Sequence, residues 1–420
     1  MKIKRWNTRN WFIVLVLFLL VFPKGGFKIE EIPITWGYLF LGITSLLFFL
    51  KSYLKLVPAH FSVILSLLPF QLYSIYMFMI NGVANFGFAI SFIIHFIFIP
   101  FLFFIQSSKL IADLNVRFFV NILKKSIFFI SLFGIFIFSF RIFTGDFLLI
   151  PFLTSNLQDT STFELTKNIA RGNLFKLFST YNNGNLLGIC LLMLLPLYQH
   201  VEKKTFMRSI VKIALVLTLS RTVWIGLLLA EILRYLYIQK ITIFSVLKLM
   251  FHLSIIGSIL AVVLHYLDRD LSFILDPTLG GRSELFNIIS DFTWIGNLPF
   301  EGICEIIYLG ILKNFGLLGL ISFIIAISSP LWIYVFSIRT QTTSFQRSLL
   351  SGLFIYLIIS CSDGAILFIP VMVFYWFLSA LLLAKPEFNL ESFEIFEKEP
   401  EEIPKKHSHI HITQIFTAKT

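Results

Sequence analysis

The chain has 420 residues, of which 57% are hydrophobic and only 14% charged, and its mean hydropathy is +0.87. Soluble domains carry about 25% charged residues, so this composition excludes a water-soluble globular enzyme and indicates a polytopic integral membrane protein. The net charge of +11 is expected where basic loops border anionic lipid. It does not indicate a nucleic-acid partner, because no stretch supplies a basic patch on a folded soluble face. The three cysteines, Cys190, Cys304 and Cys361, form no CxxC or zinc-type spacing.

Apolar runs long enough to be membrane helices follow one another along the chain. A helix needs about 20 apolar residues to cross the bilayer core. About twelve such runs predict an all-α fold, with approximate limits at 7–23, 33–50, 57–80, 86–105, 120–143, 184–199, 207–220, 222–238, 243–265, 303–337, 347–361 and 365–384. The first run follows a basic start and lacks a small-residue cleavage site, so we expect it to remain as the first helix.

Basic residues between the runs predict the orientation of the helices. Cytoplasmic loops of membrane proteins carry an excess of Lys and Arg. With the N-terminus inside, every inside loop is short and basic, the connections 144–183 and 266–302 lie outside, and the C-terminus returns to the cytoplasm. The basic residues concerned are Lys51, Lys55, Lys109, Arg117, Lys124, Lys125, Lys203, Lys204, Arg208, Arg234, Lys240, Lys248, Arg339 and Arg347.

The run 207–220 is the weakest of the predicted spans. It is short, and Ser220-Arg221-Thr222 leaves almost no loop before the next run. We therefore expect a helix junction at Arg221 on the outer side, because an Arg at the bilayer centre is costly. The alternative is one long tilted helix through Arg221, which would move all later segments to the other side.

Beyond Lys385 the composition changes to a charged tail with alternating His407, His409 and His411. Such a tail is predicted to be disordered and cytoplasmic, with metal binding by the histidines as an alternative.

Ionisable and amide side chains at membrane edges are candidates for function, because lipid makes them costly. Asn183 and Asn185 precede an apolar run, where they either cap a helix or offer donors to an anion or to sugar hydroxyls. Ser220 and Arg221 follow; a guanidinium can bind phosphate oxygens with two parallel hydrogen bonds, or it can extend towards lipid headgroups.

A third polar segment begins with Gly280-Gly281-Arg282 and leads to Glu305 and Tyr308. Glu305 and Tyr308 are spaced by one helical turn and are expected to share a face. The alternative for Glu305 is a solvated carboxylate at a helix start. No P-loop, nucleotide-binding glycine motif or pair of histidines with metal spacing occurs, so ATP-driven transport and metal-dependent hydrolysis lack support and no cofactor is expected.

In these segments the chain resembles the O-antigen polymerase and ligase family, the Wzy-type polymerases of bacterial surface polysaccharides. The resemblance spans roughly 180–330 and depends on four motifs, which occur in this chain in the same order as in the family. These are Asn185-Leu186-Leu187-Gly188, Ser220-Arg221 with Trp224 and Gly226, Gly281-Arg282-Ser283-Glu284, and Tyr308-Leu309 followed by Gly316-Leu317-Leu318-Gly319-Leu320. The ligase branch, and many polymerases, resemble one another in a His-Asn pair just before the aromatic-Leu step. Here Glu305 and Ile306 stand in its place, which favours a polymerase over a ligase.

The resemblance implies a glycosyltransferase of the bacterial inner membrane that acts at its periplasmic face on undecaprenyl-diphosphate-linked oligosaccharide. Arg221 and Arg282 would then neutralise the diphosphate in place of a metal ion. Glu305 would be the general base for the acceptor hydroxyl, and Tyr308 would position sugar. Asn183, Asn185 and Ser220 would bind substrate, and a chain-length regulator is a candidate partner.

The resemblance also suggests a division of the chain. Helices of 1–180 would precede a polymerase-like core at 181–330 with its periplasmic loop 266–302; helices of 331–384 and the tail 385–420 would follow. The alternatives are an O-antigen ligase, as in lipopolysaccharide assembly, and a lipid-linked oligosaccharide flippase or other transporter. Transporters often show a two-fold repeat, and none is seen here.

Overall fold

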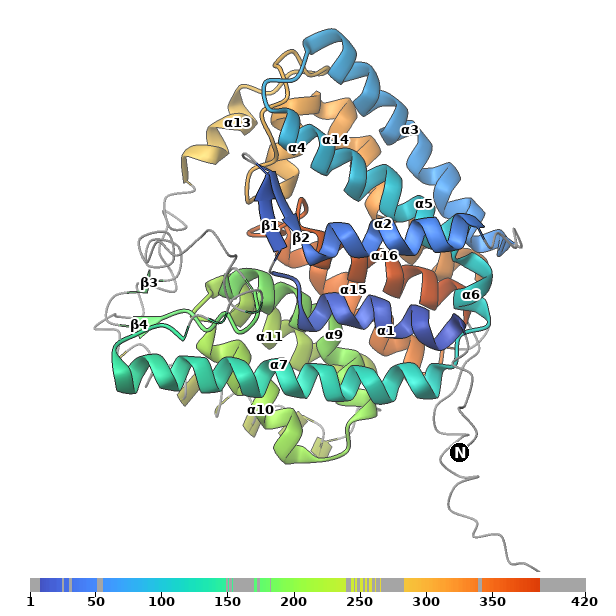
Figure 1. Cartoon of the computed structure of the whole chain (residues 1–420). Coiled ribbons are helices and arrows are strands. Elements are labelled where there is room, and N and C mark those ends of the chain that lie inside the picture. The colour runs from blue at the N-terminus through green and yellow to red at the C-terminus, as the bar shows by residue number, and fades with distance from the viewer. Residues whose placement is uncertain are drawn as a thin grey trace, which may run out of the picture. The chain divides into compact units, whose positions relative to one another are not determined.

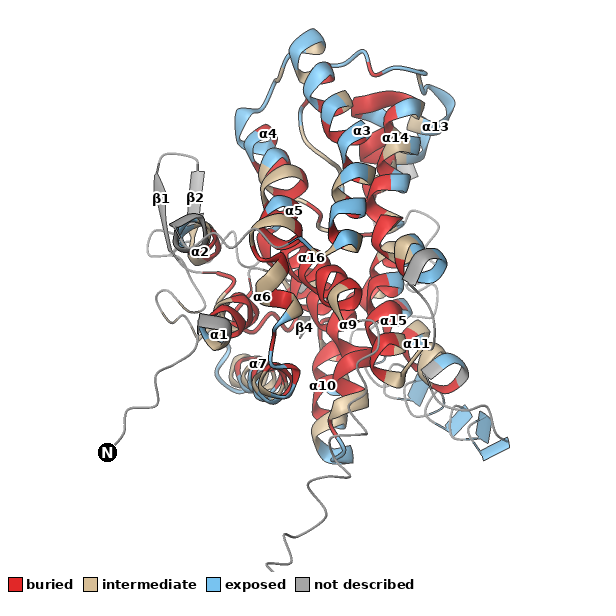
Figure 2. Cartoon of the chain, turned by 90° about the vertical axis from the view of Figure 1, so that its right-hand side faces the viewer, coloured by how far each residue is buried: buried red, intermediate tan, exposed pale blue. Residues whose placement is uncertain are grey.

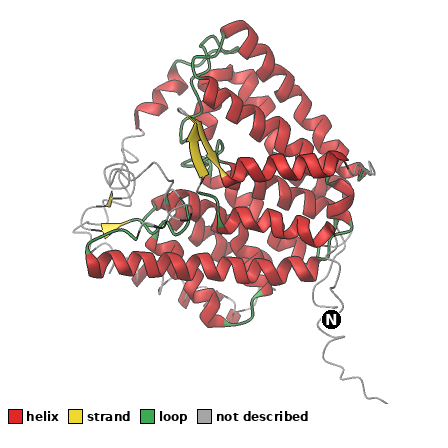
Figure 3. Cartoon of the chain, in the orientation of Figure 1, coloured by secondary structure: helices red, strands yellow, loops and turns green. Residues whose placement is uncertain are grey.

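The computed structural model describes residues 8–24, 26–29, 32–50, 56–148, 150, 153, 170–171, 174–181, 183–238, 283–338 and 342–385, together with isolated positions between 243 and 265. Almost all of its elements are helices, and the described strands form two short hairpins (Figure 3). The predicted helical fold is therefore confirmed. The described helices all belong to one compact unit, Met1–Phe388.

The elements of the first part of the chain follow the predicted apolar runs. Pro100 removes one intrahelical donor in the fourth run, and the helix widens into π turns on both sides of it. In order, the elements are α1 (Thr8–Val21), β1 (Gly26–Ile29), β2 (Ile32–Thr35), α2 (Trp36–Leu50), α3 (Pro58–Asn81), α4 (Phe86–Ile93), η1 (Ile94–Phe98), α5 (Ile99–Phe101), η2 (Leu102–Gln106), α6 (Ser108–Ala112) and α7 (Val116–Thr144).

In the second part, α10 ends at Leu217 and α11 begins at Arg221, so the predicted junction is present and the alternative of one long helix is wrong. The elements are β3 (Ala170–Arg171), β4 (Leu174–Phe175), α9 (Gly184–Val201), α10 (Thr205–Leu217), α11 (Arg221–Leu233), η3 (Arg234–Ile238), η5 (Ser283–Phe286), α13 (Asn287–Ser290), α14 (Ile307–Ile333), η6 (Tyr334–Ile338), α15 (Ser344–Ile359) and α16 (Ile369–Ala384).

Length and composition make several of these helices able to cross a membrane. Five such stretches occur among the described residues: Pro58–Asn81, Phe86–Gln106, Val116–Thr144, Gly184–Val201 and Ile307–Phe336. Shorter apolar helices accompany them in α1, α2, α15 and α16. These helices support a membrane-embedded protein.

The core of the bundle is formed by α9, α15 and α16, which are buried along most of their length (Figure 2). Outer helices such as α3 and α7 expose many apolar side chains, as expected where lipid replaces water. The central helices come very close: a Cβ on Gly352 would lie 2.0 Å from the carbonyl oxygen of Met193. A small residue at the crossing lets the two backbones approach.

α14 is not the single straight span that the run 303–337 predicts. Its helical geometry breaks at Gly316, where φ is 69°. The Tyr308 and Phe323 rings lie 6.0 Å apart, although 15 residues of straight helix would separate them by about 22 Å. The chain therefore folds back at Gly316, a conformation that glycine adopts without strain. The amides freed by the break bind the carbonyls of a preceding connection: Leu317 donates to Thr293 at 2.9 Å, and Leu318 to Trp294 at 3.1 Å.

Candidate functional site

The connection between α15 and α16 joins the start of α14. The Ile307 amide donates to the Ser360 carbonyl at 3.3 Å, and the Gly364 amide donates to the Glu305 carbonyl at 3.2 Å. A Cβ on Gly364 would lie 1.9 Å from the Ile307 side chain, so glycine is required for this approach. Sequence analysis did not single out this connection, yet it contacts each polar segment that the structure describes.

The same connection reaches the starts of α9 and α11. Asn185 donates to Asp363, as described below, and the Thr222 and Ser362 hydroxyls lie 2.9 Å apart. The starts of α9, α11 and α14 thus meet at one end of the bundle, which we call the site face. Figure 1 shows α9 and α11 near α7 in the lower part of the bundle, and α14 beside α3 in the upper part.

Three polar side chains form a buried relay at the site face. Lys176 Nζ donates to Asn185 Oδ1 at 2.8 Å, and Asn185 Nδ2 donates to Asp363 Oδ2 at 2.6 Å. Lys176 is only 3% exposed and Asp363 only 5%. Burial of charge is costly unless hydrogen bonds compensate for it. We call Lys176, Asn185 and Asp363 the Lys–Asn–Asp relay.

The two predicted asparagines have different structural roles. Asn183 is the N-cap of α9, and its side chain accepts from the Asn185 amide at 3.0 Å. The capping alternative therefore holds for Asn183, whereas Asn185 uses both ends of its amide to join two charged groups. Gly184 between them has no room for a side chain, because a Cβ would lie 2.6 Å from the Leu177 carbonyl oxygen.

Arg221 is the first residue of α11 and is partly exposed at the site face. Its neighbour Ser220 is the N-cap residue, but the Ser220 side chain makes no capping hydrogen bond to α11. The positive end of a helix and a guanidinium together favour an anion. Arg221 is thus placed to act on a negatively charged group that approaches the site face.

Glu305 and Tyr308 do not share a helical turn, contrary to the prediction from their spacing. α14 begins only at Ile307, so Glu305 precedes the helix, and its side chain is exposed. The Tyr308 hydroxyl donates to the Leu357 carbonyl of α15 at 2.9 Å. Tyr308 therefore holds α14 against α15, whereas Glu305 lies exposed before the helix.

Backbone strain is concentrated at the site face. Among the residues that the structure describes, three non-glycine residues have positive φ: Ser179 at 54°, Leu219 at 50° and Ala365 at 46°. They lie in the connections that precede α9, α11 and α16, which are the connections that hold the relay and Arg221. Such a conformation costs about 1–2 kcal/mol per residue. Strained residues cluster at functional sites, where the surrounding structure fixes them.

Lys176 and Asp363 were missed by the sequence analysis, although a signal existed. Asp363 stands alone between the apolar runs 347–361 and 365–384, and Lys176 lies just before the run at 184–199. Isolated charges at membrane edges were the criterion used to find Arg221 and Glu305. Arg282, the remaining predicted site residue, lies outside the described residues.

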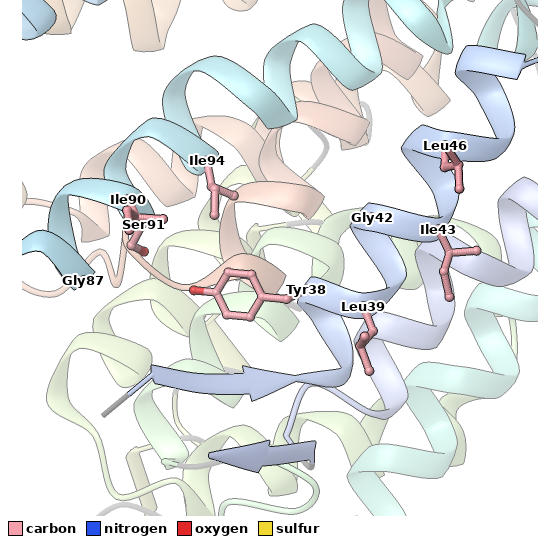
Figure 4. A pocket seen from close by; sticks show the side chains of 9 residues that line it. All are labelled: Tyr38, Leu39, Gly42, Ile43, Leu46, Gly87, Ile90, Ser91 and Ile94. Atoms are coloured by element: carbon pink, nitrogen blue, oxygen red, sulfur yellow. The ribbon is translucent and has the colours of Figure 1, made fainter. Parts of the chain in front are cut away.

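A cavity of about 520 Å³ lies beside the site, between α2 and α4 (Figure 4). It is apolar except for Tyr38 and Ser91. Ser91 Oγ donates to the Leu367 carbonyl at 3.1 Å, which ties the cavity wall to the connection that carries Asp363. The lining residues are Tyr38, Leu39, Gly42, Ile43, Leu46, Gly87, Ile90, Ser91 and Ile94.

No metal site is indicated within the described part of the chain, where no group of three or more His, Cys, Asp or Glu side chains could hold an ion. No family model, curated protein or solved structure matches the chain.

Proposed function

We propose that this protein is a bacterial surface-polysaccharide polymerase. It would transfer a growing glycan from undecaprenyl diphosphate to a new lipid-linked repeat unit, at the extracytoplasmic face of the inner membrane. The observation that carries the proposal is the buried Lys–Asn–Asp relay beside Arg221, at one face of an apolar helical bundle. The resemblance of the motifs in 180–330 adds support.

The transfer needs a base for the acceptor and cations for the leaving group. The acceptor hydroxyl oxygen forms a bond to the anomeric carbon of the donor sugar, and the bond from that carbon to the diphosphate oxygen breaks. The hydroxyl proton passes to a carboxylate, and negative charge develops on the released lipid diphosphate. Arg221 and Arg282 would stabilise this charge in place of a metal ion, with Lys176 as a further cation.

Asp363 is a better candidate for the general base than Glu305. The two segments that carry them are joined by the hydrogen bond from the Gly364 amide to the Glu305 carbonyl, but Asp363 is buried and held by Asn185, whereas Glu305 is exposed. A base held in a fixed position removes a proton more effectively than a mobile one. Glu305 and Tyr308 would then lie where the sugars approach.

The apolar cavity between α2 and α4 would hold the first part of the isoprenoid chain of the donor. It lies beside the connection that carries Asp363, and its lining residues Leu39, Ile43 and Leu46 are exposed, so the cavity is open to the surroundings of the bundle. An apolar chain could therefore enter from the bilayer while its diphosphate reaches Arg221.

The alternatives differ in the step that they perform. An O-antigen ligase uses the same donor, but the His-Asn pair of that branch is missing here. A flippase or other transporter needs a polar path through the bundle; α11 has no charged residue between Arg221 and Glu231. The polymerase is therefore the function that the site supports best.

A gel of the surface glycans and the lipid-linked glycans from cells lacking the protein distinguishes these functions. A single repeat unit on the final acceptor is the result expected of a polymerase. Long chains trapped on the lipid carrier would mean a ligase, and single units trapped on the inner leaflet would mean a flippase. An unchanged pattern would refute all three.

Complementation then tests the residues. We expect Asp363→Asn to leave single repeat units, whereas Glu301→Gln, which changes an exposed carboxylate just before α14, should restore long chains. For Glu305→Gln, wild-type chain lengths would remove this residue from the mechanism.

A further inference from the structure

A second charged cluster lies at the opposite face, where α9 and α11 end and α10 begins. At its centre, Glu231 is fully buried. It pairs with Lys212 at 2.8 Å and with Arg234 at 3.4 Å, and Gln199 Nε2 donates to it at 2.6 Å. All the negative charge of Glu231 is therefore matched within the bundle.

The other carboxylate of this cluster, Glu202, is also fully engaged. It is only 4% exposed, pairs with Lys124 at 3.3 Å and accepts from the Lys204 amide at 2.9 Å. Glu202 and Glu231 together thus pair with three cations, and Arg208 is a fourth cation in the same cluster. We call Lys124, Glu202, Arg208, Lys212, Glu231 and Arg234 the basic cluster.

Arg208 is the cation of this cluster that forms no salt bridge with a described carboxylate. Its Nε donates to the backbone carbonyl of Glu202, and no carboxylate of the described residues forms a salt bridge with its guanidinium. The guanidinium is partly buried; the charge of Arg234 repels it, and the charge of Glu202 attracts it. Four cations against two carboxylates leave an excess of positive charge in a partly buried place.

An anion with several oxygens would remove this imbalance. Guanidinium groups bind phosphate oxygens with two parallel hydrogen bonds each, and two neighbouring guanidinium groups can share one phosphate. Phe206, two residues before Arg208, is exposed on the same helix start. An apolar side chain beside a cation at a helix end fits the boundary between acyl chains and headgroups.

We propose that Arg208 and Arg234 bind the phosphate of an anionic phospholipid at the face opposite the candidate site. The same chemistry would accept inorganic phosphate, and the experiment distinguishes the two sources. The proposal does not depend on the polymerase activity. If that activity is correct, this face is the cytoplasmic one, where basic pockets between helices bind anionic headgroups.

Lipid retention by the full-length protein, measured by native mass spectrometry in neutral detergent, tests the proposal. Dioleoyl-phosphatidylglycerol is compared with dioleoylglycerol, which has the same chains and no phosphate, and with inorganic phosphate alone. Arg208→Gln is the main variant, because Arg208 has no carboxylate partner that the change would leave buried and unpaired. Lys125→Gln is the control, since Lys125 is an exposed cation on α7 next to Lys124.

We expect phosphatidylglycerol to be retained by the wild type and by Lys125→Gln, and its apparent affinity to fall about tenfold in Arg208→Gln, as for loss of a hydrogen bond between charged groups. Arg208→Lys should lie between, because a point charge remains without the fork. Binding of inorganic phosphate alone, lost in Arg208→Gln, would support the phosphate site and overturn the lipid as its source. Equal retention by all variants, or equal retention of dioleoylglycerol, would overturn the proposal.

Discussion

Removal of the Lys176 ammonium should destabilise the protein, because Asn185 and the buried Asp363 carboxylate remain without it. In Lys176→Met, Asn185 loses the ammonium that orients its amide, and the buried Asp363 carboxylate loses the positive end of the relay. A hydrogen bond to a charged group is worth about 1.5–3 kcal/mol, and breaking a buried pair costs about 3–5 kcal/mol. We therefore expect Lys176→Met and Asp363→Leu each to lower the free energy of unfolding by about 3 kcal/mol.

The double variant separates a coupled relay from two independent contacts. With both charged ends of the relay removed, neither end is left as a buried charge that has lost the other, so the double variant should be more stable than the sum of the single effects by about 1–3 kcal/mol. Equilibrium unfolding in mixed detergent and dodecyl sulfate micelles measures each free energy. Chain elongation should be lost in all three variants, because restored stability does not restore the charges.

An exposed ion pair at the start of α14 supplies the control. Lys313 and Glu301 lie 3.2 Å apart, but their side chains are 43% and 65% exposed. Exposed pairs contribute about 0.2–1 kcal/mol, so Lys313→Met and Glu301→Leu should show little coupling and keep full elongation. Coupling in the relay no larger than in this surface pair would refute the reasoning.

Four further predictions follow from single contacts. Arg221→Lys should nearly abolish chain elongation at wild-type protein level, because a point charge does not replace a bidentate fork; wild-type chain lengths on a glycan gel would contradict it. Gly352→Ala should lower the Tm strongly through its clash with the neighbouring backbone, whereas Gly42→Ala, where nothing lies within 4 Å, should leave it unchanged. Gly42→Trp should fill the cavity and shorten the glycan, whereas Leu72→Trp, on an exposed part of α3, should not. Burial alone would raise the pKa of Glu202, but its hydrogen bonds and its ion pair more than offset this effect and hold the pKa below its ordinary value. The wild type should therefore be more stable than Glu202→Gln at neutral pH, and this difference in the free energy of unfolding should disappear as the pH falls through the folded-state pKa.

Apolar runs and local caps predict the helices well, because these signals are contained in neighbouring residues. Asn183 caps α9, as its type and position suggested. The junction at Arg221 could be predicted for a similar reason, since a charge within a span is more costly than a turn at its end. These features need no knowledge of what lies on the other side of the bundle.

The break in α14 and the relay depend on contacts that no local pattern contains. The residues that follow Gly316, 317–321, are apolar or glycine, and hydropathy does not show where a helix changes direction. Only the carbonyls of Thr293 and Trp294, more than 20 residues earlier, satisfy the amides freed at the break. Asn185 and Asp363 are likewise 178 positions apart in the sequence. Their types were visible from the start, but their contact was not.

The cost of the site face is itself an argument for function. A buried lysine, a buried aspartate and three strained backbone positions lie around the starts of a few helices. Apolar side chains at Lys176 and Asp363 would fit a buried membrane-protein interior at lower cost. Since such departures from local preference concentrate where structure is used for chemistry, the site face is the place where a substrate should bind.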